Sequence, residues 1–185
     1  MKLDQCALRE LSPADSALVL SWRNSARVRS VMYTDHVIGP DEHEAWLAKT
    51  LSDESSQVLI FEAGGKPVGV VSFTEISPLP SVGERTASWG FYIGDPESPR
   101  GLGTIMGILA IDNAFGVLHL GTLSASVLGS NVASLAFHEK LGFRADTMLS
   151  EQVLKSCVPE DVVLLSLLAS DWPEVRSTVM QGYGE

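Results

Sequence analysis

A short run with two glycines, Pro99-Arg100-Gly101-Leu102-Gly103-Thr104, lies between an apolar strand-like stretch and a long helical pattern. The glycines let the backbone turn tightly and leave N–H groups without partners at a helix start. The partial positive charge of a helix start favours a phosphate group there. A Gly-x-Gly turn by itself is weak evidence, because many such turns bind nothing. The run is therefore a candidate phosphate site that needs support from a second element.

That second element is Asn131-Val132-Ala133-Ser134-Leu135-Ala136-Phe137-His138-Glu139-Lys140-Leu141-Gly142-Phe143. In this order, the two stretches resemble the acetyl-coenzyme A (acetyl-CoA) site of the GCN5-related N-acetyltransferases, the GNAT family. The family pattern Arg/Gln-x-x-Gly-x-Gly/Ala is matched at Arg100 and Gly103, whereas Ile105 stands where glycine or alanine is usual. The resemblance implies an acyltransferase that takes acetyl-CoA as cofactor and moves its acetyl group to an amine.

In this family the pantetheine arm lies between two splayed parallel strands and bonds to backbone groups left unpaired there. The resemblance also implies that the N–H of Phe91 or its neighbour points at the thioester oxygen and stabilises the developing negative charge. The residues assigned in this way to coenzyme binding are Phe91, Tyr92, Ile93, Arg100, Gly101, Leu102, Gly103, Thr104, Asn131, Ser134, Phe137 and Lys140.

Two side chains are candidates for proton transfer. Many family members carry a tyrosine at the place of His138, where it protonates the departing thiolate. A histidine, with a reference pKa of about 6.5, could do the same when protonated, or it could only pack against the cofactor. Ser88 stands two residues before Gly90, where relatives that acetylate protein N-termini often have a glutamate. Serine can hold a water that relays a proton, which favours an acceptor amine that is already largely neutral, such as that of an amino sugar.

The N-terminal third determines substrate choice in this family, and here it contains Trp22-Arg23-Asn24-Ser25-Ala26-Arg27-Val28-Arg29. The chain looks most like the amino-sugar N-acetyltransferases of pseudaminic acid biosynthesis, which serve flagellin glycosylation. They acetylate the 4-amino group of a UDP-linked 4-amino-4,6-dideoxy-N-acetyl-altrosamine. Such a nucleotide sugar needs cations for its phosphates, and Arg23 and Arg29 could supply them. His43 and Trp46 could hold the uridine, although tryptophans at helical spacing are often core residues.

Two other functions stay open. A protein N-terminal acetyltransferase of the ribosomal-protein type shares the Trp-Arg-Asn opening, and a peptide substrate would favour acidic residues near the amine. A catalytically silent module that binds acetyl-CoA is the third possibility, because of Ile105 and Ser88. The loop at 77–84 could line the pocket for a nucleotide sugar or the pocket for a peptide.

Composition limits the partners. The 185 residues correspond to one domain, residues 1–185, and 45% of them are hydrophobic against 19% charged. A formal net charge of −10 disfavours nucleic acid as a partner, but a local positive pocket could still bind a small anion. Cys6 and Cys157 have no metal-ligand spacing, so we expect no metal site and no disulfide framework. Without a signal peptide or a run of about 20 apolar residues, we expect a cytoplasmic protein with no membrane segment. A homodimer is one expectation, because relatives are often dimers.

The elements that must position these residues follow from hydrophobic periodicity. Ser12-Pro13-Ala14-Asp15 and Gly39-Pro40-Asp41-Glu42 each indicate a helix start, and Gly64-Gly65-Lys66 indicates a hairpin. The ranges expected to be strands are 6–11, 57–63, 67–73, 86–93, 123–128, 143–149 and 162–168. The ranges expected to be helices are 12–23, one from 39, 104–118 and 131–142. The order predicts an α/β GNAT fold: a mixed, mostly antiparallel sheet with a splayed parallel strand pair, flanked by helices.

Overall fold

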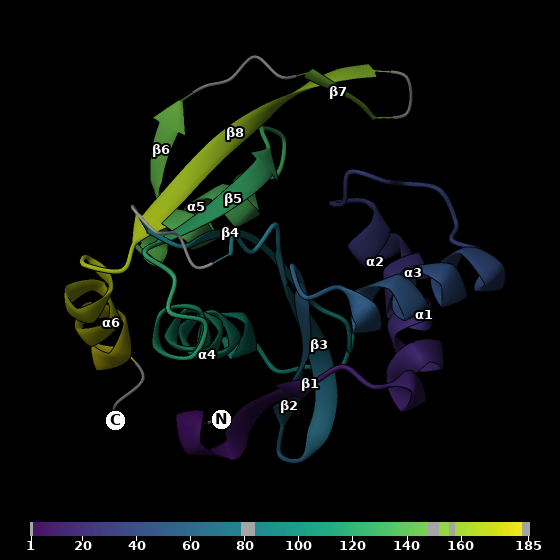
Figure 1. The fold of residues 1–185 in the computed structure, drawn as a ribbon, viewed down its shortest axis with the longest axis horizontal. Helices are drawn as coiled ribbons and strands as arrows, with labels where there is room; N and C mark the ends of the chain where they lie inside the picture. The colour runs from purple at the N-terminus through teal and green to yellow at the C-terminus, as the bar shows by residue number, and fades with distance from the viewer. Residues whose placement is uncertain (1, 79–83, 148–151, 156–157, 183–185) are drawn as a thin grey trace.

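The computed structural model describes residues 2–78, 84–147, 152–155 and 158–182. A mixed sheet forms its centre, with the strand order β1-β2-β3-β4-β5-β8-β6, and β7 pairs with β8 beyond this path (Figure 1). The expected α/β fold is confirmed. The strands are β1 (Cys6–Glu10), β2 (Gln57–Ala63), β3 (Lys66–Thr74), β4 (Thr86–Ile93), β5 (Thr122–Leu128), β6 (Arg144–Thr147), β7 (Gln152–Lys155) and β8 (Val158–Leu168). The α-helices are α1 (Ser16–Asn24), α2 (Ala26–Arg29), α3 (Pro40–Ser52), α4 (Leu102–Gly116), α5 (Val132–Lys140) and α6 (Trp172–Gln181).

The parallel contact between β4 and β5 is short. Its register runs only from Thr86 with Thr122 to Ser88 with Ser124. Beyond that point β4 continues to Ile93 beside β3, while β5 continues to Leu128 beside β8. The two strands therefore diverge after Ser88, as the resemblance predicted.

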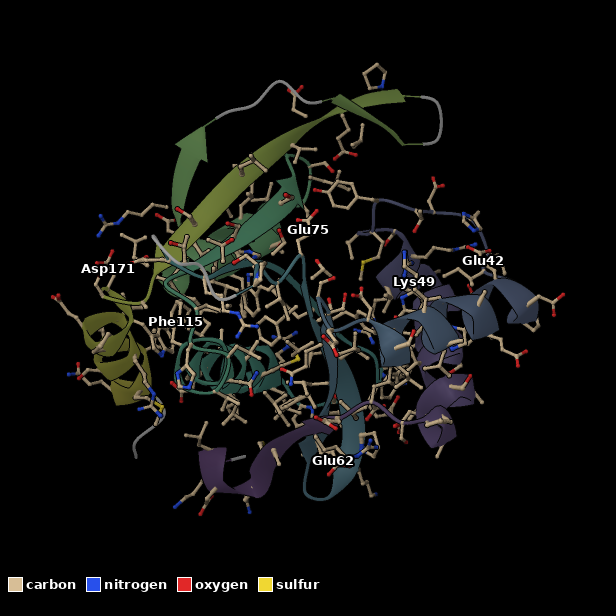
Figure 2. All side chains as sticks on the ribbon, in the orientation of Figure 1. Glu42, Lys49, Glu62, Glu75, Phe115 and Asp171 are labelled. Carbon is tan, nitrogen blue, oxygen red and sulfur yellow. The ribbon has the colours of Figure 1, made fainter. Side chains whose placement is uncertain are left out.

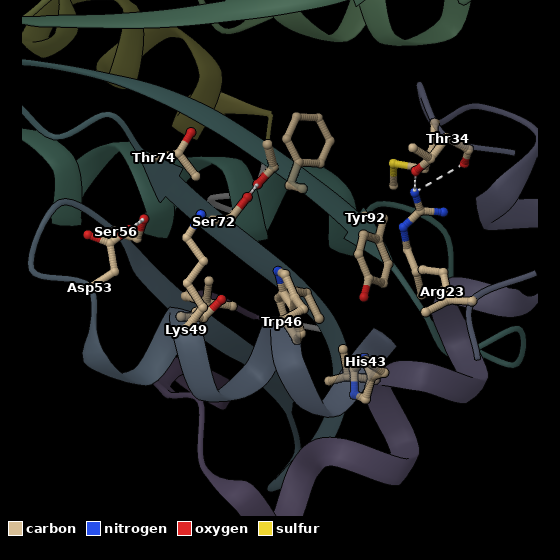
Figure 3. A pocket seen from close by; sticks show the side chains of 18 of the residues that line it. Arg23, Thr34, His43, Trp46, Lys49, Asp53, Ser56, Ser72, Thr74 and Tyr92 are labelled. Atoms are coloured by element: carbon tan, nitrogen blue, oxygen red, sulfur yellow. Dashed lines mark hydrogen bonds between the residues drawn. The ribbon is translucent and has the colours of Figure 1, made fainter. Parts of the chain in front are cut away.

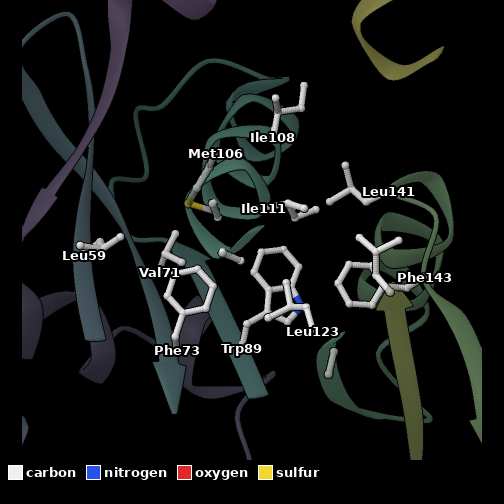
Figure 4. Packing of buried hydrophobic residues seen from close by; sticks show 14 of the residues in the cluster. Leu59, Val71, Phe73, Trp89, Met106, Ile108, Ile111, Leu123, Leu141 and Phe143 are labelled. Carbon is white, nitrogen blue, oxygen red and sulfur yellow. The ribbon is translucent and has the colours of Figure 1, made fainter. Parts of the chain in front are cut away.

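Alternating side chains give the sheet two separate cores. Leu59 and Val71 belong to the larger core under α4, together with Trp89, Met106 and most of α4 (Figure 4). Residues one position along, such as Ile60, face the smaller core made with α1 and α3. Period-two alternation produces this arrangement, because successive side chains of a strand point to opposite faces. It also places Ser88, Gly90 and Tyr92 on one side of β4 and Trp89, Phe91 and Ile93 on the other.

The helix after the glycine run is buried more completely than the sequence analysis predicted. Ile108 and Ile111 recur at helical spacing and are fully buried, but Ile105, Met106 and Ala110 are buried as well. The helix spans Leu102–Gly116 rather than 104–118, because Gly101 adopts φ 93° and ends the preceding turn. A left-handed backbone of this kind is natural for glycine and strained for other residues.

Several other boundaries differ from the prediction. Pro13–Asp15 forms a 3-10 turn ahead of α1, because the buried Asp15 carboxylate accepts hydrogen bonds from Arg9 and from Ser12. The short helix α2 and strand β7 were not predicted, and β8 starts four residues early, at Val158. The helix α6, Trp172–Gln181, follows β8 and was not predicted either. Parts of the predicted loop at 77–84 and strand at 143–149, as well as Cys157, lie outside the described residues. Within the described residues, helices that could span a membrane are absent.

Candidate active site

The glycine run forms the start of α4. Gly101 is the N-cap residue, and Thr104 N–H and Ile105 N–H both point back to its carbonyl, at 3.1 and 3.4 Å. The N–H groups of Leu102 and Gly103 come too early in the helix to have an acceptor within it. A Cβ built on Gly103 would meet only the Phe137 ring, at 3.9 Å, so the backbone is open to a ligand on that side. This end of α4 has the geometry that a pyrophosphate requires.

The second motif packs directly against the first. A Cβ on Gly107 would lie 2.7 Å from Leu141 and 2.9 Å from Phe137, so only glycine lets α5 approach α4 this closely. Lys140 Nζ then donates to Thr104 Oγ1 at 3.3 Å and adds a positive charge beside the α4 start. Asn131 caps α5, its Oδ1 accepting from the Ser134 N–H at 3.1 Å. The structure thus brings the two predicted coenzyme motifs together.

The gap between β4 and β5 opens beside this pair of helices. Phe91 lies beyond the last paired residue, Ser88, and its ring contacts the Phe137 ring at 4.7 Å between centroids. The backbone of Phe91, Tyr92 and Ile93 is therefore free of β5, and it lies between the α4–α5 side and a separate cavity. This arrangement fits an extended chain that would replace the missing strand pairing.

The separate cavity has a volume of about 630 Å³ and lies between the sheet and α1 and α3 (Figure 3). Gly90, Phe91 and Tyr92 of β4 contribute to its wall, so the cavity adjoins the point where β4 and β5 diverge. His43 and Trp46 of α3 stack on each other at 5.2 Å and line it as well. We regard it as the acceptor cavity, because it reaches the same segment of β4 from the opposite side of the sheet.

Close packing fixes α1 over the acceptor cavity. A Cβ on Gly94 would lie 2.1 Å from the Trp22 ring, so the glycine at the end of β4 gives this ring its place. Arg27 Nη2 donates to the Gly94 carbonyl at 2.8 Å. In α3, the His43 ring is buried and shares a hydrogen bond of 2.9 Å with the Ser16 carbonyl. These contacts attach α1 and α3 to the neighbouring segments beside the cavity.

Arg23 is a partly buried cation in the wall of the acceptor cavity. Its Nη2 donates to the carbonyl and to the hydroxyl of Thr34, at 3.2 and 2.5 Å (Figure 3). Its Nη1 is buried and has no hydrogen-bond partner among the described residues. Burial lowers the pKa of Arg23, and burial likewise raises the pKa of the nearby Tyr92 phenol. An unpartnered guanidinium N–H in a cavity wall is a group suited to binding an anion.

Two lining features were missed by the sequence analysis. Lys49 of α3 extends into the cavity, and three carboxylates line it, those of Glu42, Asp53 and Glu75. Ser88 lies two residues before Gly90, on the same face of β4. Its Oγ donates to Glu75 Oε2 at 3.0 Å. No sequence signal pairs Ser88 with Glu75, because their contact depends on the register of β3 with β4 across an intervening loop.

His138 is enclosed by aromatic rings, with Trp89, Phe91 and Phe143 at 5.5, 5.6 and 5.0 Å between centroids. Its Nδ1 lies 2.7 Å from the Ser134 carbonyl, which can only accept, so Nδ1 carries the hydrogen. Its Nε2 is buried and has no partner among the described residues. Burial lowers the pKa of His138 and favours the neutral ring. Of the two roles left open, these surroundings favour packing; proton donation stays a prediction.

The predicted substrate residues separate in space. Arg23, His43 and Trp46 line the acceptor cavity, whereas Arg29 on α2 is not among its lining residues in the described chain. Ile105, the departure from the family pattern, is buried in the larger core. Its side chain is therefore used in packing under the sheet.

Fold and site together fit an acyltransferase that would hold its acyl carrier where β4 and β5 diverge. The chain matches the family model described as Acetyltransferase (GNAT) domain over residues 6–144, and it therefore belongs to the GNAT acetyltransferases. It is an acetyl-CoA-dependent N-acetyltransferase, as the resemblance implied. Comparison with curated protein sequences gives no match.

Solved structures with the same fold include spermidine N-acetyltransferase from Vibrio cholerae in complex with CoA and spermine. It has a TM-score of 0.83 at 22% sequence identity, over 92% of this chain and 99% of that chain. A dodecameric structure of spermidine N-acetyltransferase from Vibrio cholerae in an intermediate state has a TM-score of 0.73 at 20% identity, over 91% and 96% of the two chains. At these identities the likeness concerns the fold.

Acetyl-CoA supplies an activated acetyl thioester, and the residues present fit it. The N–H groups at the start of α4 and the ammonium of Lys140 would hold the pyrophosphate. Phe91, Tyr92 and Ile93 would orient the pantetheine arm through their backbone. An N–H of this segment would stabilise negative charge on the thioester oxygen. The acceptor amine would reach the same segment from the cavity under α1 and α3.

Proposed function

We propose that the acceptor is a nucleotide-linked amino sugar, of the UDP-4-amino-4,6-dideoxy-N-acetyl-altrosamine type that serves pseudaminic acid biosynthesis and flagellin glycosylation. The observation that carries this proposal is Arg23, whose buried Nη1 has no partner among the described residues. Leaving a charged N–H buried without an acceptor costs free energy, so a ligand with phosphate oxygens would complete its bonding.

Two further features support an anionic, aromatic ligand. Lys49 is a second cation in the cavity wall. It could take the phosphate-binding role that was expected of Arg29. The stacked rings of His43 and Trp46 offer an apolar surface for a uracil base. Phosphates would lie near the two cations, and the sugar amine would point toward Gly90 and Phe91, beside the thioester.

A polyamine is the second candidate, because Glu42, Asp53 and Glu75 also line the cavity and would attract a polycation. The structural relatives named above are spermidine N-acetyltransferases. The two candidates differ in the sign of their charge. Removing a cation from the wall should therefore weaken the binding of one and strengthen the binding of the other.

The test is a comparison of acetyl transfer to the UDP-linked 4-amino sugar, to spermidine and to a peptide with a free N-terminus. We expect kcat/KM to be highest for the nucleotide sugar. In Lys49→Met, we expect it to fall for the nucleotide sugar and to rise or stay level for spermidine. Lys66→Met, on the exposed β2–β3 hairpin, is the matched control. Turnover with spermidine or the peptide alone would reject the nucleotide-sugar acceptor.

A further inference from the structure

Three carboxylates line the acceptor cavity, and they differ in what they already bind. Glu42 is paired with His36 at 3.0 Å. Asp53 accepts hydrogen bonds from the serines at 55–56, which lower its pKa and make it a weak base. Glu75 has no cation within ion-pair distance in the described part of the chain. Its carboxylate is therefore the one in the cavity wall that is neither ion-paired nor held by several donors.

The partner of Glu75 lies at a mechanistically important place. Ser88 is the last residue of β4 that pairs with β5, so its hydroxyl marks the point where the coenzyme cleft opens. In the register of β3 with β4, Thr74 faces Ser88 and Ser72 faces Gly90. Ser72, Thr74 and Gly90 all line the acceptor cavity. Alternation places the Ser88 side chain on that same face, next to the segment where the amine meets the acetyl group.

We propose that Glu75, acting through the hydroxyl of Ser88, is the terminal proton acceptor for the acceptor amine. Ser88 Oγ already donates its hydrogen to Glu75 Oε2 at 3.0 Å, which is the direction in which the proton must pass (Figure 2 shows Glu75 near the end of β3). Two positions along a strand span about 6.6 Å, so one water molecule fits between Ser88 Oγ and an amine beside Gly90. The role that relatives give to a glutamate on β4 is thus divided between a serine on β4 and the glutamate that directly follows β3.

The atoms balance as follows. The ammonium gives one proton through the water to Ser88 Oγ, while Ser88 passes its own hydroxyl proton to Glu75. The neutral nitrogen then forms a bond to the acetyl carbon, the carbon–sulfur bond breaks, and the leaving thiolate takes the second proton of the nitrogen to become a thiol. Glu75 is exposed to solvent, so its proton leaves to bulk water and the carboxylate is restored.

The proposal concerns the acetyl-transfer chemistry and does not depend on which amine is the acceptor. Its test compares the wild type with Glu75→Gln, Ser88→Ala and Glu44→Gln, where Glu44 is an exposed glutamate of α3 outside the cavity. Two rates are measured from pH 6 to 10: acetyl transfer to the UDP-linked 4-amino sugar and to spermidine, and acetyl-CoA hydrolysis without any acceptor, detected as free thiol. Thermal unfolding of each variant checks its folding.

We expect Glu75→Gln to lower transfer at pH 7 by about 10²–10⁴-fold, with the deficit shrinking as rising pH deprotonates the amine in solution. Hydrolysis should fall too, because the same relay activates water. Ser88→Ala should lose less, since a water can replace the hydroxyl, and Glu44→Gln should match the wild type. A deficit that stays constant with pH, or unchanged transfer and hydrolysis, would overturn the proposal. Transfer to spermidine alone would reject the proposed acceptor while leaving the Glu75 effect in place. If neither acceptor reacts, the rate of acetyl-CoA hydrolysis in Glu75→Gln tests the role of Glu75, and an unchanged rate would overturn it.

Discussion

Replacing Arg23 by methionine should separate ligand binding from folding. In the free protein, the substitution removes two hydrogen bonds from Nη2 to Thr34, each worth about 1 kcal/mol. It also removes a partly buried cation whose Nη1 has no partner in the described part of the chain, and this gain opposes the loss. We therefore expect the free energy of unfolding to change by no more than about 1–2 kcal/mol. A guanidinium that served mainly to hold the fold through a buried ion pair would cost about 3–5 kcal/mol when removed.

Binding of a phosphate ligand should respond much more strongly. A hydrogen bond to a charged group contributes about 1.5–3 kcal/mol, which corresponds to roughly 10–150-fold in affinity. UDP is the probe, because it carries the proposed phosphates and needs no transfer chemistry. Titration calorimetry should show the Kd of UDP raised by this factor in Arg23→Met, and the KM of the UDP-linked amino sugar should rise similarly with kcat largely kept.

Two controls sharpen the measurement. Lys66→Met removes a cation outside the cavity and should leave the Kd of UDP unchanged. Arg29→Met decides whether Arg29, which does not line the cavity in the described chain, still takes part in binding. An Arg23→Met protein that binds UDP as tightly as the wild type, or that loses stability by several kcal/mol, would refute the reasoning.

The remaining predictions concern the coenzyme site, the packing of α1 and the enclosed histidine. Gly103→Glu places a carboxylate where the pyrophosphate would bind. Calorimetry should therefore show at least about 100-fold weaker CoA binding, with little change in melting temperature. Unchanged affinity for CoA would contradict this. Gly94→Ala should destabilise the protein by about 1–3 kcal/mol, because its Cβ would overlap the Trp22 ring. The control Gly116→Ala has open space around it and should not be destabilised. Equal stabilities of the two variants in chemical denaturation would argue against the packing account. His138→Phe should keep turnover within about threefold, against the ~10²–10⁴-fold loss expected for a proton donor. Because burial lowers the pKa of His138, wild-type stability should fall as pH drops below about 6.5, by at most ~1.4 kcal/mol per pH unit, and this dependence should be absent in His138→Phe.

Local signals were sufficient for the two helix starts on the coenzyme side of the site. The glycines at 101 and 103 mark a helix start, and Asn131 caps the second helix, because both depend on backbone preferences within a few residues. The alternation along β4 placed Gly90 and Tyr92 on the acceptor face for the same reason. The divergence of β4 from β5 came from the family resemblance and not from the residues alone.

The acceptor side depended on contacts between distant segments. Ser88 meets Glu75 only because β3 and β4 pair in one particular register across a loop whose length does not determine it. The unpartnered Nη1 of Arg23 depends on how α1 packs against the end of β4. The same limit applies to His138, whose aromatic neighbours come from β4 and from the residue just before β6. Propensity and spacing carry no information about such encounters.

A crystal structure with bound acetyl-CoA is the most direct test of the central claim that the diverging strands hold the coenzyme. We expect the pantetheine arm beside Phe91, Tyr92 and Ile93, with the pyrophosphate on the N–H groups at residues 101–104. Density for the coenzyme elsewhere, or strands β4 and β5 paired beyond Ser88 and Ser124, would contradict it.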